Sequence, residues 1–450
     1  MDTIIFVPGY AGSQLTLNGN EVWPPTLWEL AVTGYHRLNE LTDPNTQKNG
    51  VIDTLGFFPF LVPVYQPIDD DLSYIAAQLG ITKIDFDFDW RVDIYATTMP
   101  LLVQTIKAAY QGGARSISLV CHSQGGIIAR LLLENDAYRL NPPSWFRAIK
   151  QFVGICNPHL GAPLIVANSL GVFGFQGIPA SDMPALAADP RYPAGYQALP
   201  PLGYNRLRKQ PGNHGVNIYA TTVNGYFGPT SNNIQATVQS YAHLNIANQP
   251  CQYYFIAGNN QSTPEQVDTS SSLLPPYTPE YNDSGDGTVP LWSAAPGPMT
   301  ASVFPGSHTG IFVVDAFRQR LFQILTGGTV MPTPFAEEPV AVISLNKTVY
   351  GPGERISVLV IPDKPTRAFT GALRISRAVG DKFDKFESIG PDLELRYAGA
   401  ETTHLSMQLV APDKPGAYRI TLEDSEYVTT PMTVGTFFVN PEAGPRLDRK

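Results

Sequence analysis

Three residues that lie far apart in the sequence carry side chains suited to nucleophilic chemistry at a carbonyl carbon: Ser123, Asp286 and His308. A serine hydroxyl becomes a nucleophile when a histidine takes its proton. A carboxylate then holds the imidazole in the required tautomer and stabilises its charged form. We predict Ser123 as the nucleophile, His308 as the base and Asp286 as the carboxylate.

The residues around Ser123 are typical of a sharp turn between a strand and a helix. The pentapeptide Cys121-His-Ser-Gln-Gly125 follows a short apolar run at 117–120 and precedes a helix-compatible segment at 126–134. In such a nucleophile elbow, small neighbours let strand and helix approach closely while the serine hydroxyl is lifted above the sheet. Cys121 stands where the pattern has glycine, and its side chain is also small. The order Ser, Asp, His along the chain is that of α/β-hydrolases.

Other histidines compete for the role of the base. His122 adjoins Ser123 and cannot readily face it, whereas His159 follows a strand too early in the chain. His404 lies in the C-terminal part of the sequence. His308 remains the best candidate because it lies in a loop after a late strand, where the base belongs.

The acidic candidates are also open to more than one interpretation. Asp286 lies in a Gly-Asp-Gly stretch that would equally fit a surface turn, and Asp283 is its main competitor. Asp89 and Arg91 are further candidates for a catalytic role, but we interpret them as a structural ion pair because such pairs are common.

Apolar runs of strand length alternate with helical segments along the first two thirds of the chain. Expected strands lie at 4–7, 81–88, 117–120, 147–156, 252–257 and 303–304, and expected helices at 70–79, 92–110, 126–134 and 311–325. This alternation indicates βαβ units, a mostly parallel sheet and helices on both faces, as in the α/β-hydrolase fold. The glycine-rich loop at 8–13 suits an oxyanion hole, with a plain Pro-Gly turn as the alternative.

A chain of 450 residues exceeds the usual size of a single core, so we expect two domains. We assign 1–330 to the α/β-hydrolase domain, with cap or lid excursions at about 16–63 and 163–216, where clear periodicity is lost. Residues 331–338 read as a proline-containing linker. Seven short runs then predict an all-β immunoglobulin-like sandwich at 339–440.

Composition excludes several classes of function. A net charge of -9 argues against a nucleic-acid partner. The histidines are scattered and the three cysteines form no C-x-x-C pair, so we predict no metal ion and no cofactor. We expect Cys121, Cys156 and Cys251 to be free thiols, and with no signal-peptide pattern or long apolar stretch we predict a cytoplasmic location.

Six motifs, taken in order, resemble the lecithin:cholesterol acyltransferase (LCAT) family, which includes lysosomal phospholipase A2 and phospholipid:diacylglycerol acyltransferases. They are Val7-Pro-Gly-Tyr-Ala-Gly-Ser-Gln-Leu15, Phe88-Asp-Trp-Arg91, Cys121-His-Ser-Gln-Gly-Gly126, Asn157-Pro-His-Leu-Gly-Ala-Pro163, Gly285-Asp-Gly-Thr-Val-Pro290 and Ser307-His-Thr-Gly310. The resemblance covers about residues 4–326 and leaves the C-terminal sandwich outside it.

The resemblance implies a serine hydrolase or O-acyltransferase that acts on lipid esters, phospholipase A or lipase-like, through an acyl-enzyme on Ser123. It places the backbone N–H groups of Tyr10 and Gln124 in the oxyanion hole. Gln124 stands where the family usually has Met. The alternatives are an esterase for a non-lipid or short-chain ester and a catalytically silent binding protein. The expected partners are an acyl-ester substrate, a membrane or lipid surface contacted transiently, and a protein or surface bound by the sandwich.

Overall fold

The computed structural model describes residues 2–57, 60–220, 231–270, 272–273, 277–297, 300–328, 339–380 and 383–444. The predicted linker at 331–338 lies outside these ranges. A six-stranded sheet in the order β15-β12-β9-β8-β1-β7 forms the centre of the N-terminal part, and all its pairings are parallel. Its strands are β1 (Asp2–Val7), β7 (Thr82–Asp85), β8 (Ser116–His122), β9 (Ile149–Ile155), β12 (Gln252–Asn259) and β15 (Ala301–Pro305).

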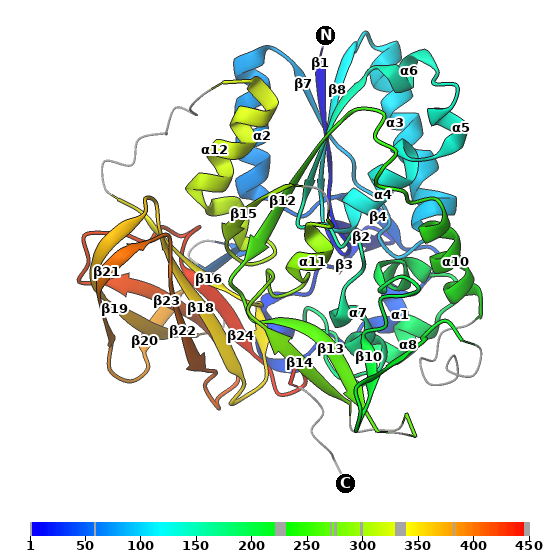
Figure 1. Cartoon of the computed structure of the whole chain (residues 1–450). Helices are drawn as coiled ribbons and strands as arrows, with labels where there is room; N and C mark the ends of the chain where they lie inside the picture. Colours follow the sequence, from blue (N-terminus) through cyan, green and yellow to red (C-terminus); the bar gives the residue numbers. More distant parts are fainter. Residues whose placement is uncertain are drawn as a thin grey trace.

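The inner strands of this sheet send alternate side chains into two apolar layers, as β1 shows. Ile5 and Val7 of β1 belong to the layer that contains α3 (Met99–Gln111) and α4 (Gln124–Leu133). Ile4 and Phe6 belong to the layer that contains α2 (Gln66–Leu79) and α12 (Asp315–Thr326). Figure 1 shows α2 and α12 on one face of the sheet and α3 and α4 on the other. The inner strands β1, β8, β9 and β12 are mostly buried on both faces, as is typical of parallel sheets, and the chain has the predicted α/β-hydrolase fold.

Two of the expected helices are divided in the structure. The helix expected at 92–110 begins as a π-helical turn, η2 (Ile94–Thr98), and continues as α3. Asp93 caps this turn by accepting hydrogen bonds from two backbone N–H groups, so helical structure starts after it. The helix expected at 311–325 is a short 3-10 turn, η4 (Gly310–Val313), followed by α12. Val314 between them is extended.

The excursions at 16–63 and 163–216 are built from short elements rather than lacking structure. The first contains β2 (Ser13–Leu17), β3 (Asn20–Trp23), η1 (Glu29–Thr33), α1 (Leu38–Leu41), β4 (Gln47–Val51), β5 (Thr54–Phe57) and β6 (Phe60–Pro63). The second contains α7 (Pro163–Ser169), α8 (Met183–Ala188), η3 (Pro193–Ala198), β10 (Leu207–Lys209) and β11 (His214–Val216). The helices α7, α8 and η3 of the second excursion each have proline in the first turn. The fixed φ angle of proline suits that position, but proline there adds nothing to the hydrophobic periodicity from which a helix is predicted.

Further short elements complete the N-terminal part. They are α5 (Asp136–Arg139), α6 (Ser144–Arg147), α10 (Ser231–Ala242), β13 (Thr263–Thr269), β14 (Thr278–Asn282) and α11 (Leu291–Ala294). Strands β13 and β14 join two strands of the second excursion in a sheet of order β11-β10-β13-β14. None of the helices in the described ranges has the length and apolar character needed to cross a bilayer.

The C-terminal part is the predicted β-sandwich. One sheet has the order β16-β18-β22 and the other β17-β24-β23-β19-β20, with β21 paired to β19. The strands are β16 (Ala341–Leu345), β17 (Val349–Tyr350), β18 (Arg355–Pro362), β19 (Thr366–Val379), β20 (Lys385–Ser388), β21 (Leu393–Thr402), β22 (Leu405–Val410), β23 (Gly416–Glu423) and β24 (Gly435–Val439). All seven expected strands occur, together with the short β17 and β20.

The sandwich shares apolar cores with the N-terminal part. Phe60 packs against Phe383, Phe386 and Phe438, with ring centroids 5.6 to 6.1 Å apart. On the other side, residues of β16 and β18 belong to the same buried cluster as α2 and α12. The sandwich also has a core of its own between its two sheets. Figure 1 shows it beside the lower ends of α12 and β15.

Candidate active site

Ser123 occupies a strained position between β8 and α4. Its backbone has φ 52° and ψ -127°, a region that residues other than glycine rarely adopt. Such a conformation costs about 1–3 kcal/mol and persists only where surrounding contacts hold it. Here the Ser123 N–H donates to the Ile155 carbonyl at 2.9 Å, and the Gly126 N–H donates to the Ser123 carbonyl at 3.0 Å. The structure therefore contains the elbow that the sequence predicted.

The two glycines after Ser123 are required by close packing. A Cβ at Gly125 would lie 2.5 Å from the Pro8 carbonyl oxygen, and one at Gly126 would lie 2.2 Å from the Asn157 amide. Asn157 in turn donates to the Ser123 carbonyl at 2.7 Å and to the Cys121 carbonyl at 3.0 Å. The elbow is thus fixed by an amide side chain from the loop after β9.

The three predicted residues meet at the carboxyl ends of the strands. His308 Nε2 lies 2.9 Å from Ser123 Oγ, and His308 Nδ1 lies 2.7 Å from Asp286 Oδ2. Asp286 is fully buried, and its Oδ1 accepts from the N–H groups of Thr288 at 2.9 Å and Val289 at 2.7 Å. A carboxylate only accepts, so His308 Nδ1 carries the proton and Nε2 is left to accept from the serine hydroxyl. This arrangement can activate Ser123.

The competing candidates have other surroundings. Asp283 is exposed and, among the described residues, forms no hydrogen bond with a histidine. His159 is buried, and its Nδ1 lies 3.1 Å from Arg130, whose guanidinium is paired with Glu134. Burial and the Arg130 charge hold the pKa of His159 well below its usual range. His404 lies in the sandwich, between β21 and β22.

His122 has a supporting contact that the sequence did not reveal. The Gly9 N–H donates to Tyr65 Oη at 2.8 Å, and Tyr65 Oη lies 2.8 Å from His122 Nδ1. His122 Nε2 lies 3.0 Å from the His308 carbonyl oxygen and must donate to it. Tyr65 is then the donor to Nδ1, and burial lowers the pKa of His122 well below its ordinary value, which favours this neutral form. This series of hydrogen bonds connects the glycine-rich loop, through Tyr65 and His122, to the backbone carbonyl of His308, the candidate base.

The backbone N–H groups of Tyr10 and Gln124 have no acceptor within the described part of the chain. The loop that carries Tyr10 lies directly against the nucleophile, because a Cβ at Gly9 would be 2.7 Å from Ser123 Cβ. Gln124 is buried, and its Nε2 donates to the Ala194 carbonyl of η3 at 2.6 Å. An amide at this position therefore joins the elbow to the second excursion, which gives a structural reason for glutamine where the resembled family usually has Met.

The sandwich reaches the loop that carries His308. The Ser307 N–H donates to Ser344 Oγ at 3.0 Å, and the Ser344 hydroxyl donates to Ser307 Oγ at 3.1 Å. The Gln261 amide also donates to Ser344, at 3.2 Å. A Cβ at Gly287, which has φ +90°, would lie 2.2 Å from the Asn346 carbonyl oxygen. Sequence reasoning missed these contacts because nothing local in the sandwich marks Ser344.

Two other predictions concern residues near the site. Asp89 and Arg91 form the expected ion pair at 2.7 Å, with Arg91 buried and bonded to the carbonyls of Leu41 and Thr46. Cys121, Cys156 and Cys251 are free thiols, as predicted.

Cys156, Asp286 and His308 bring three potential metal ligands within 4.8 Å of one another. Both oxygens of Asp286 already accept hydrogen bonds from the protein. Burial and the neighbouring Asp286 raise the pKa of the Cys156 thiol, which disfavours the thiolate that a metal would need. The protonated thiol and the occupied carboxylate oxygens are both unfavourable for metal binding at this group.

No family model matches the chain, and no curated protein matches it in sequence. It is similar in structure to the mature lipase BlEst2 of Bacillus licheniformis, with 13% identity, 73% of this chain and 92% of that chain covered, and a TM-score of 0.34. It is also similar in structure to phospholipase PlaB of Legionella pneumophila, with 11% identity, 99% of this chain and 91% of that chain covered, and a TM-score of 0.34. A third similar structure is the lin2722 gene product of Listeria innocua, with 11% identity, 73% of this chain and 95% of that chain covered, and a TM-score of 0.31. Similarities this distant carry no argument about activity, and the resemblance to the LCAT family stays a prediction.

Proposed function

We propose that this protein is a serine hydrolase that cleaves lipid acyl esters through an acyl-enzyme on Ser123. The single observation that carries the proposal is the continuous hydrogen-bonded line from Ser123 Oγ through His308 to the buried carboxylate of Asp286. A strained serine at an elbow, held by Asn157 and two glycines, supports the same role, because strain of this kind gathers at functional positions.

The first half of the reaction forms the acyl-enzyme. Ser123 Oγ attacks the ester carbonyl carbon while its proton passes to His308 Nε2, and negative charge develops on the carbonyl oxygen. The free N–H groups of Tyr10 and Gln124 are the candidate donors to that oxygen. The carbon–oxygen bond to the alcohol then breaks, and His308 returns the proton to the departing alcohol oxygen.

The second half releases the acyl group. Water attacks the acyl carbon and gives its proton to His308, which passes it to Ser123 Oγ as the fatty acid leaves. An alcohol in place of water would give a new ester, so transfer uses the same residues. We expect hydrolysis to dominate in dilute solution, because an acceptor alcohol must compete with water at about 55 M.

A lipid ester is supported by the six motifs that resemble the LCAT family, which follow one another in order over about residues 4–326. The glycine-rich loop itself is held by aromatic packing, because the ring of Tyr10 contacts Trp90 at 4.8 Å and Phe175 at 5.6 Å between centroids.

The test supplies purified protein with radiolabelled phospholipid, with and without a long-chain alcohol, and follows free fatty acid and new ester. We expect mainly free acid, and no product from Ser123→Ala. Mostly new ester at modest alcohol concentration would place the protein among acyltransferases. An equal rate from Ser123→Ala would overturn the proposal.

A further inference from the structure

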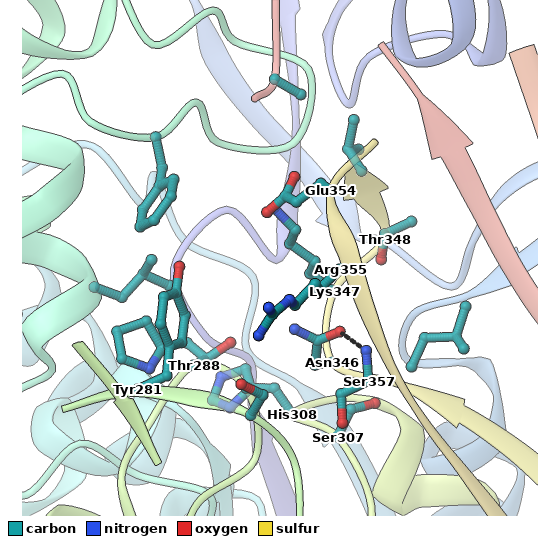
Figure 2. A pocket seen from close by; sticks show the side chains of 18 of the residues that line it. Tyr281, Thr288, Ser307, His308, Asn346, Lys347, Thr348, Glu354, Arg355 and Ser357 are labelled. Atoms are coloured by element: carbon teal, nitrogen blue, oxygen red, sulfur yellow. Dashed lines mark hydrogen bonds and ion pairs between the residues drawn. The ribbon is translucent and has the colours of Figure 1, made fainter. Parts of the chain in front are cut away.

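A cavity of about 640 Å³ lies between the sandwich and the loops of the α/β part, beside His308. His308 and Thr288 line it on the α/β side, and the sandwich contributes 345–349 and 354–355. Figure 2 shows side chains from both parts pointing into the same space. The volume falls in the range of small-molecule sites, about 300–1,000 Å³.

The position of the cavity indicates which part of an ester would occupy it. His308 Nε2 must return its proton to the departing alcohol oxygen, so the alcohol has to leave on the side of His308. The lining combines polar side chains, among them Asn168, Gln176, Asn282, Thr288, Asn346 and Ser357, with the apolar side chains of Leu164, Phe173 and Phe175. A lining of both kinds suits an alcohol that carries polar groups on a carbon skeleton. The cavity therefore fits the alcohol half of the substrate.

Four charged side chains line the cavity besides His308. Lys347 is bonded to Glu354, and its ammonium also lies 5.7 Å from the Phe173 ring centroid, so this pair is neutralised and held in place. Arg355 is exposed and has no ion-pair partner among the described residues. In Figure 2 its side chain points into the cavity, while Lys347 lies against Glu354. Asp283 is the fourth.

A guanidinium without a protein partner is suited to bind a phosphate oxygen pair through its planar fork. The carboxylate of Asp283 in the same lining would repel a second negative charge, which favours a phosphodiester with one charge over a phosphomonoester with about two.

We propose that this cavity binds the alcohol half of the ester and that Arg355 of the sandwich binds a phosphodiester on that alcohol. Acyl esters of glycerol that carry a phosphodiester are already implied by the resemblance to the LCAT family, and the new element is the residue that would select them, Arg355. This inference rests on the proposed ester hydrolysis at Ser123, and it gives the sandwich a direct part in substrate selection.

The test compares two soluble esters with the same acyl chain and the same glycerol, 1-hexanoyl-glycero-3-phosphocholine and 1-hexanoylglycerol. For Arg355→Gln we expect the ratio of their kcat/KM values to fall about 10- to 100-fold, because a charge-assisted hydrogen bond is lost. Arg355→Lys should give an intermediate ratio. Arg396→Gln is the matched control, since Arg396 is 79% exposed on β21 and does not line the cavity, and it should leave the ratio unchanged.

Each outcome decides one point. An unchanged ratio for Arg355→Gln overturns the inference, whereas a wild-type protein that cleaves neither ester overturns the proposed function instead. Glycerophosphocholine should inhibit competitively in the wild type and much less in Arg355→Gln. If inorganic phosphate alone inhibits equally well, the cavity binds free phosphate and the head-group assignment is wrong.

Discussion

Replacing Asp286 by asparagine would change the tautomer of the candidate base, and the structure dictates the direction. The N–H groups of Thr288 and Val289 both donate to Asp286 Oδ1, so the amide of Asp286→Asn must place its oxygen there. Its NH₂ group then faces His308 Nδ1, which has to accept. The proton moves to Nε2, which can donate to Ser123 Oγ but can no longer take its proton.

The expected loss in kcat is about 10⁴-fold, as for the same exchange in serine proteases of this chemistry, or about 5.5 kcal/mol of transition-state stabilisation. The assay is kcat/KM on a soluble p-nitrophenyl ester, with circular dichroism to verify folding. Asp283→Asn is the matched control, because it removes a neighbouring carboxylate that is not bonded to His308. Activity of Asp286→Asn within tenfold of wild type, or a larger loss in Asp283→Asn, would show that the acid has been assigned to the wrong residue.

Three further predictions concern the supports of the site. Ser344→Ala should leave the buried Ser307 N–H without its acceptor, at a cost of about 1–3 kcal/mol, and lower kcat/KM; an unaltered melting temperature and rate would contradict this. The pKa of His122 is lowered in the folded state, so the folded protein binds a proton at this site less readily than the unfolded chain does. The free energy of unfolding therefore keeps the full contribution of neutral His122 above about pH 6.5 and loses it as pH falls toward the lowered pKa. His122→Gln should therefore lose less stability than wild type between pH 7.5 and 5 in urea unfolding, and an equal loss in both proteins would refute this. A chain ending at residue 338 would remove the aromatic partners of Phe60, expose Phe60 to water and should aggregate or lose most activity, whereas a soluble, fully active monomer by gel filtration would show that the shared core is dispensable.

The sequence was sufficient for the parts of the site that follow from local chemistry. The elbow could be predicted because strand, small residues and helix are contiguous, and chain order then led to Asp286 and His308. Asn157 was visible only as the first residue of a motif, without a role. Tyr65 carried no local signal, since its contact with His122 joins residues 57 apart in sequence.

The relation between the two parts of the chain could not be read from the sequence. Prolines near residue 332 and the change from helical to alternating patterns predicted a separate sandwich, and its strands were placed well. The aromatic contacts of Phe60 and the hydrogen bonds of Ser344 depend on how the sandwich docks. Docking is set by surfaces that meet only after both parts have folded, so neither the shared core nor the cavity beside His308 could be anticipated.

The most direct test of the central claim is to locate the nucleophile chemically. The protein is treated with a fluorophosphonate, digested and analysed by mass spectrometry, with Ser123→Ala and His308→Ala as controls that should fold normally by circular dichroism. We predict one phosphonylated residue, Ser123, no adduct in Ser123→Ala and a reaction slowed by several orders of magnitude in His308→Ala. An adduct on another residue, or none on a folded wild-type protein, would contradict the account.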